Sequence, residues 1–142
     1  MEHYIHKVHY YETDKMGITH HSNYIRWMEE ARVDYLDRIG FGFARLEREG
    51  IQSPVIAVDC KYLRPTAFDD EVEIRVRVKE FRGVRLIIAY DMFHRATGEQ
   101  VLTGTSSHCF LDESGKPIVL KRRVPALDAL LRERADAEGA DA

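Results

Sequence analysis

Apolar and polar positions alternate through much of the chain, and this period of two predicts β-strands. The stretch from 71 to 81, EVEIRVRVKEF, shows the pattern most clearly. One side of this strand should face the core, with Val72, Ile74, Val76, Val78 and, in the same series, Glu80. The other side should face the solvent, with Glu73, Arg75, Arg77 and Lys79. Similar runs at 53–63, 85–94 and 100–111, and an earlier one at 3–12, predict four more strands.

The period changes to that of a helix after the first predicted strand. From Ser22 to Ile39 the apolar residues form one stripe: Tyr24, Trp27, Met28, Ala31, Tyr35 and Ile39. Ser22 is placed to cap the first turn, and Gly40 is placed to end the helix. Glu29 and Arg32, spaced by three, should form a pair on the helix surface.

One strand, one long helix and four further strands with no convincing helix between them predict an α+β domain. Its single antiparallel sheet would pack on the helix, and turn-forming segments would join the last four strands as a meander. A shorter helix is expected at 43–50 and an amphipathic turn or two at 125–135. The 142 residues suit one domain over 1–135, and the few apolar residues at 136–142 predict a disordered tail.

Composition and charge argue against several classes of function. A net charge of −3 does not favour a nucleic-acid or anionic-membrane surface that covers the whole protein. No stretch approaches the ~20 apolar residues of a membrane span, and the first residues lack an apolar signal segment, so we expect a cytoplasmic protein. Cys60 and Cys109 lie in predicted strands without zinc or redox spacing, which favours reduced thiols.

The histidines are the first candidates for a metal site. His3, His6 and His9 are spaced by three, and on a strand His6 would point away from the other two. His20 and His21 are adjacent and lack a second pair at the usual ligand spacing. We therefore expect no metal.

The segment YYETDKMGITHH, directly before the long helix, is a better candidate for chemistry. The first turn of a helix leaves backbone N–H groups unpaired and carries partial positive charge, which suits a carbonyl oxygen that becomes negative during a reaction. Asp14, turned back at Gly17, could act on that carbonyl as nucleophile or as general base. The plainer interpretation, which the residues alone favour, is a turn-forming aspartate beside an ordinary helix cap.

The wider stretch YYETDKMGITHHSNYIRWMEEAR resembles the N-terminal motif of hotdog-fold acyl-CoA thioesterases of the 4-hydroxybenzoyl-CoA thioesterase type, a group that includes the thioesterase associated with the Tol-Pal system. The matching positions are Tyr11, Thr13, Asp14, Gly17, Ile18, His21, Asn23, Tyr24, Ala31 and Arg32. The segments KYLRPTAFDDEVEI and HCFLDESGKPIVLKRRVP also resemble family segments, so the resemblance extends from Tyr4 to Leu131. It implies a hotdog fold, with a five-stranded antiparallel sheet wrapped around one long helix.

The resemblance also implies roles for single residues. Asp14 would be the catalytic carboxylate. The backbone N–H of His21 would donate a hydrogen bond to the thioester carbonyl oxygen, and Gly17 would form the tight turn between them. The His21 side chain would line the pocket or orient water. Tyr24 and Trp27 would either line the acyl pocket or pack in the core.

Coenzyme A, as part of the substrate, brings phosphates that call for basic side chains, and no separate cofactor is implied. The basic candidates lie near the Pro65 turn, around Gly83 and in the closing segment: Lys61, Arg64, Arg82, Arg85, Lys121, Arg122 and Arg123. The family resemblance further implies a homodimer formed by edge pairing, often assembled into a tetramer, with substrate at the interface between subunits.

Hydrolysis of an acyl-CoA to the free acid and CoA is the leading hypothesis. A non-catalytic hotdog module that binds acyl-CoA is the alternative, which the retained Asp14 disfavours. A hotdog dehydratase would need an HFPG-like loop, and the sequence lacks one. The acyl group and the choice between nucleophile and general base cannot be read from these residues.

Overall fold

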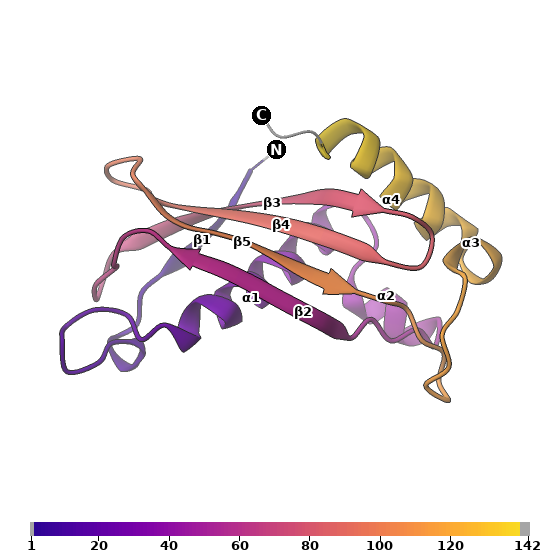
Figure 1. The fold of residues 1–142 in the computed structure, drawn as a ribbon, viewed down its shortest axis with the longest axis horizontal. Coiled ribbons are helices and arrows are strands. Elements are labelled where there is room, and N and C mark those ends of the chain that lie inside the picture. Colours follow the sequence, from indigo (N-terminus) through magenta and orange to yellow (C-terminus); the bar gives the residue numbers. More distant parts are fainter. Residues whose placement is uncertain (1, 140–142) are drawn as a thin grey trace.

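The computed structural model describes residues 2–139 (Figure 1). Five antiparallel strands form one sheet in the order β1-β3-β4-β5-β2, and helices lie against it and beside it. The elements, with η1 a short 3-10 helix, are β1 Tyr4–Lys7, η1 Tyr10–Glu12, α1 Ser22–Arg38, α2 Phe43–Arg48, β2 Val55–Tyr62, β3 Glu71–Phe81, β4 Leu86–His94, β5 Gln100–His108, α3 Leu120–Arg123 and α4 Pro125–Glu138.

The predicted α+β class and the five antiparallel strands are confirmed, whereas the predicted four-stranded meander is wrong. Strand β2 pairs with β5 and not with β3. The chain crosses the inner face of the sheet as α1, and α2 then leads it to the edge beyond β5 (Figure 1). As a result β2 is an edge strand, and most of its residues are exposed.

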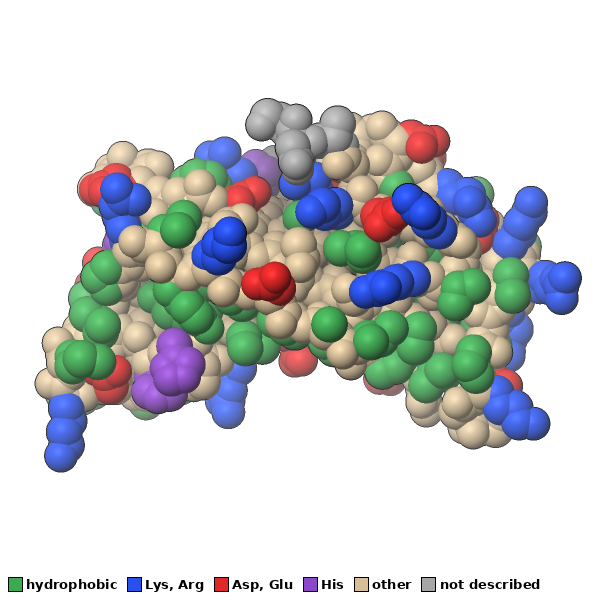
Figure 2. Space-filling model, viewed as in Figure 1, with side chains coloured by type: hydrophobic (Ala, Val, Ile, Leu, Met, Phe, Trp, Pro, Cys, Tyr) green, Lys and Arg blue, Asp and Glu red, His purple; other side chains and the backbone are tan. Residues whose placement is uncertain are grey.

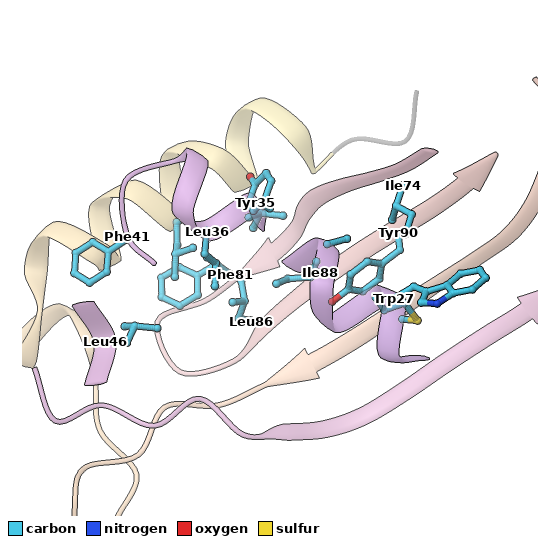
Figure 3. Close-up of a cluster of buried hydrophobic side chains, with 14 of the residues drawn as sticks. Trp27, Tyr35, Leu36, Phe41, Leu46, Ile74, Phe81, Leu86, Ile88 and Tyr90 are labelled. Atoms are coloured by element: carbon cyan, nitrogen blue, oxygen red, sulfur yellow. The ribbon is translucent and has the colours of Figure 1, made fainter. Parts of the chain in front are cut away.

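The apolar stripe of α1 fills the space between this helix and the inner face of the sheet. Trp27 and Ala31 are fully buried, and they share one core with Ile74, Ile88 and other inward residues of β3 and β4. Figure 3 shows how these side chains from helix and sheet meet. Because fully burying one such large apolar side chain is worth roughly 1.5–3 kcal/mol, this layer supplies much of the stability of the domain.

Buried and more exposed residues alternate along β3 up to a β-bulge. Val72, Ile74 and Val78 are buried, as predicted. The register shifts between Val78 and Glu80, so that Phe81 is the next residue in the core. The prediction for Glu80 is therefore wrong, because an extra residue in one strand reverses the alternation that follows it.

The end of the chain is more ordered than the sequence predicts. Helix α4 has 14 residues, packs along β3 and continues to Glu138, so residues 136–138 are helical and not part of a tail. The carboxylate of Glu138 accepts hydrogen bonds from the Tyr35 hydroxyl at 2.5 Å and from the Val78 N–H at 3.1 Å. The domain thus has a second long helix besides α1, and positions 140–142 of the predicted tail lie outside the described residues.

A row of polar side chains crosses the core from α1 to the sheet. Arg32 is buried, and its Nη1 donates to the Tyr90 hydroxyl at 3.2 Å. The Tyr90 and Ser106 hydroxyls lie 2.6 Å apart, and Ser106 Oγ lies 2.7 Å from Nε2 of His108. Glu29 is exposed, so the predicted surface pair of Glu29 with Arg32 is wrong. The helical position of Arg32 turns it inward, toward the sheet.

The buried His108 predicts a pH-dependent stability. Burial first, and then the charge of Arg32, lower the pKa of His108 from 6.5 to about 4. The unfolded chain therefore binds this proton at a higher pH than the folded chain, and the free energy of unfolding should fall by up to about 3 kcal/mol as the pH drops from about 6.5 to about 4.

Urea unfolding at a series of pH values checks this. His108→Asn should remove most of that slope, while His3→Asn, which changes an exposed histidine, should leave it intact. An unchanged slope in His108→Asn would contradict the assignment.

Candidate active site

The segment between η1 and α1 folds into a small hairpin that brings Asp14 back toward the start of the helix. The Asp14 N–H donates to the Ile18 carbonyl at 2.9 Å, and the His20 N–H donates to the Glu12 carbonyl at 2.8 Å. The Gly17 N–H closes the turn on the Asp14 carbonyl at 2.9 Å, with Gly17 at φ +79°. The predicted turn at Gly17 is confirmed, and its positive φ explains the glycine.

The Asp14 side chain is half-buried, and its two oxygens differ in their surroundings. Oδ1 accepts the Met16 N–H at 2.8 Å, which fixes the side chain within the turn. Among residues 2–139, Oδ2 has no hydrogen-bond or ion-pair partner. One oxygen of the carboxylate thus holds the geometry while the other is available to a substrate or a water.

Helix α1 begins at the predicted cap residue itself, one residue earlier than predicted. His21 is the N-cap residue and Ser22 is the first helical residue, so the prediction that Ser22 caps the helix is wrong. The Ser22 hydroxyl lies 2.8 Å from Nδ1 of His20 instead. In the described part of the chain the His21 N–H has no acceptor, and the first turn contains no acidic residue. Among the described residues, therefore, no acidic side chain of the first turn neutralises the positive end of this 17-residue helix.

The start of α1 meets the end of the edge strand β2. The Tyr62 hydroxyl donates to the His21 carbonyl at 3.3 Å, and the two rings lie edge to face with centroids 6.3 Å apart. The exposed His21 ring also stacks on His20 at 4.3 Å. Figure 2 shows histidine side chains at this corner beside apolar side chains along the β2 edge. His21 thus lies at the boundary of the sheet edge.

Glu12 joins the hairpin to the rest of the molecule. Its buried carboxylate lies 2.8 Å from His6 Nε2 of β1 and accepts the indole N–H of Trp27, on α1, at 2.6 Å. Its Oε1 also accepts the His9 N–H at 2.8 Å. Burial alone would raise the pKa of Glu12, but hydrogen bonds from His9, His6 and Trp27 outweigh it and lower the pKa below 4.5. The ionised carboxylate therefore connects strand, helix and hairpin.

Sequence reasoning missed this role, because residues 3–12 were predicted to be one strand. The strand ends at Lys7. His6 and His9 therefore approach each other, with ring centroids 5.4 Å apart, and the prediction that strand geometry separates them is wrong. One ligand atom each from His6, His9 and Glu12 lies within 4.8 Å of the others. Both carboxylate oxygens of Glu12 already accept hydrogen bonds, and the expected absence of a metal stays a prediction.

Tyr24 and Trp27 were predicted either to line the acyl pocket or to pack in the core, and in this chain both pack in the core. Trp27 has no exposed surface, and Tyr24 is 4% exposed. The Tyr24 hydroxyl lies 2.9 Å from the Thr66 hydroxyl, and its ring packs against Trp27 and Tyr62. Tyr24 therefore supports Tyr62 at the edge of the site, and Trp27 acts on the hairpin through Glu12.

The predicted phosphate ligands are not brought together with Asp14 within one chain. Lys61 lines an open groove of about 690 Å³ on the outer face of the sheet. Arg64 lies just beyond the end of β2 and pairs with Glu99 at 2.7 Å. The other five lie at the far end of the sheet from the hairpin, in the β3–β4 turn and in α3: Arg82, Arg85, Lys121, Arg122 and Arg123 (Figure 1). Among the described residues, no helix is long and apolar enough to span a membrane.

Comparison with known proteins places this geometry in a family. Residues 8–133 match the model of the thioesterase-like superfamily. The Bacillus subtilis protein named "Putative acyl-CoA thioesterase YneP" is 33% identical over 120 residues, which cover 84% of this chain and 86% of that protein. The crystal structure of a DHNA-CoA thioesterase from Staphylococcus aureus superposes with a TM-score of 0.90 and 30% identity, over 99% of this chain and 96% of the other. The chain therefore belongs to the thioesterase-like superfamily, and it is an enzyme of the thioester hydrolase class.

Proposed function

We propose that this enzyme hydrolyses acyl-CoA thioesters with Asp14 as the catalytic carboxylate and the His21 N–H as the donor to the oxyanion. The observation that carries the proposal is the hairpin, which turns the segment with an available carboxylate oxygen back toward the unpaired N–H at the positive end of α1. Such donors act on charge that develops in the transition state, which is where hydrogen bonds lower a barrier. The names of the relatives support the same substrate class.

Two routes are compatible with this arrangement. In one, an Asp14 oxygen bonds to the thioester carbon, charge collects on the carbonyl oxygen beside the His21 N–H, and collapse expels CoA thiolate to leave a mixed anhydride. Water then hydrolyses the anhydride and restores Asp14. In the other, Asp14 takes a proton from the water that attacks the same carbon, and this proton passes to the leaving thiolate.

The substrate would lie at an interface between two copies of the chain. The edge strand β2 offers unpaired backbone groups together with exposed apolar side chains, of which Val55 is 45%, Ile56 55% and Val58 38% exposed. Such an edge is a template for pairing with a second strand. An isologous dimer pairs β2 with β2 in antiparallel orientation, which sets the far end of one copy beside the hairpin of the other.

This pairing would also explain the placement of the basic residues. Those of the β3–β4 turn and of α3 lie far from Asp14 in their own chain, but in the paired arrangement they approach Asp14 of the second copy: Arg82, Arg85, Lys121 and Arg122. They are then available to the phosphates of CoA. The closer assignment to the 4-hydroxybenzoyl-CoA thioesterase type stays a prediction. Thiol release from a panel of aromatic, short, medium and long acyl-CoAs, with DHNA-CoA among them, would test it and identify the acyl group.

Asp14→Asn should lower turnover by about 10²–10⁴-fold, because the amide cannot act as nucleophile or base. It can still accept the Met16 N–H, so the turn and CoA binding should persist. Thiol release measures the turnover, and calorimetric titration with CoA measures the binding. Asp69→Asn is the matched control, since Asp69 is exposed and its φ of 73° suits asparagine. Wild-type turnover in Asp14→Asn would refute the assignment, and saturable acyl-CoA binding without thiol release by the wild type would favour the non-catalytic module.

Glu12→Gln should weaken both the fold and the site. A neutral amide loses the charged hydrogen bonds to His6 and Trp27, at a cost of about 2 kcal/mol or more in unfolding free energy. Displacement of the hairpin should lower turnover by about tenfold, assayed well below the melting temperature. Glu47→Gln, an exposed change of the same kind, should alter neither quantity. Glu12→Gln with wild-type stability and turnover would show that the hairpin does not depend on this carboxylate.

Val58→Lys should separate the dimer, because it places a charge on the pairing edge. Light scattering should then give the 16.5 kDa mass of one chain in place of twice that mass, and thiol release should fall with it. Val33→Lys changes a valine of nearly the same exposure, in the second half of α1 and not on the pairing strand, and should leave the mass unchanged. A monomeric wild type with full activity would overturn the interface.

A further inference from the structure

The interior beside the second half of α1, away from the hairpin, contains a buried charge next to free space. A small cavity separates the second half of α1 from α2, α4 and the ends of β4 and β5. Its walls are mainly apolar, with Leu36, Leu46, Ile88, Phe110 and Leu127 among them. The free space is narrow and suits a single water-sized or halide-sized particle. Arg32 lines the cavity, ten residues after Ser22, which is about 15 Å along the helix.

Arg32 is a buried cation without a counter-ion. Its side chain is 7% exposed, and its single described hydrogen bond runs from Nη1 to the neutral Tyr90 hydroxyl. The buried Nε–H has no acceptor. No carboxylate among residues 2–139 lies within ion-pair distance of the guanidinium. Taking a charge out of water without pairing it is strongly unfavourable, so a buried guanidinium is expected to have an anionic partner.

The polar neighbours of Arg32 do not supply negative charge. Burial raises the pKa of Tyr90, which keeps its hydroxyl protonated. His108 lines the cavity too, and burial together with Arg32 lowers its pKa, so its ring is neutral near pH 7. Ser106 Oγ lies between the two, within 2.7 Å of each. A trapped water would satisfy the Nε–H but would leave the charge of Arg32 uncompensated.

We propose that this cavity binds a monovalent anion of halide size, held by the guanidinium of Arg32 and enclosed by the apolar walls. Polyatomic acids such as gluconate are too large for the space. The ion is bound only by the folded chain, because the walls come from α1, α2, β4, β5 and α4 together. Its binding should therefore stabilise the fold in a saturable manner. The site is separate from Asp14 and does not depend on the proposed hydrolysis.

The melting temperature of the full chain, followed in sodium chloride and in sodium gluconate at equal ionic strength, tests the proposal. Chloride should raise the wild-type melting temperature by a few degrees with a saturating dependence, since binding to the folded state alone has this form. Arg32→Met, which keeps length without charge, should lose the difference. Arg38→Met removes a more exposed arginine of the same helix, paired with Asp34, and should retain it.

Crystals of the wild type grown in sodium bromide provide a test that does not require a variant to fold. An anomalous bromide peak within hydrogen-bond distance of Arg32 Nε is expected. Equal melting temperatures in the two salts, an equal chloride effect in Arg32→Met, or a cavity that holds only a water would each overturn the proposal.

Discussion

The buried carboxylate of Glu12 is the interaction on which the site depends. It accepts hydrogen bonds from β1, from α1 and from the backbone of its own segment, while its main-chain carbonyl accepts the His20 N–H and the amide of Asn23. One residue thus fixes both strands of the hairpin against the first turns of the helix. Because hydrogen bonds to a charged group in a dry environment are stronger than neutral ones, the hairpin can hold Asp14 rigidly although it lies on the surface.

The second constraint is the position of β2 at the edge of the sheet. The Tyr62 end of this strand contacts the His21 carbonyl, and Val55, Ile56 and Val58 present apolar side chains to solvent. The catalytic candidates and the pairing edge therefore share one corner of the molecule. The basic residues of the β3–β4 turn and of α3 lie at the opposite end, so in the proposed dimer a second chain would bring them to this corner. The same topology explains why the residues of the predicted site separate into two groups.

Much of the fold follows from local pattern. The alternation of apolar and polar residues in β3 depends on residues two positions apart, and it was predictable as far as the bulge after Val78. The apolar stripe of α1 depends on residues three or four positions apart, and it was predictable too. The turn at Gly17 likewise needed only local chemistry. The pairing of β2 with β5 was not predictable, because it depends on where α1 and α2 lead the chain. Glu12 was hidden within an apparent strand, and its partner Trp27 is fifteen residues away. The buried position of Arg32 could have been predicted, because Arg32 lies four residues from Met28 and from Leu36, on the buried stripe of the helix.

In the proposed mechanism the hairpin and the start of α1 act together on one thioester carbonyl. The structure of the enzyme with an acyl-CoA analogue in which a ketone replaces the thioester would test it most directly. We expect the ketone oxygen to lie about 2.7–3.1 Å from the backbone nitrogen of His21, with the carboxylate of Asp14 facing the carbonyl carbon directly or through one water. A ketone bound away from His21, or with Asp14 turned from it, would contradict the account.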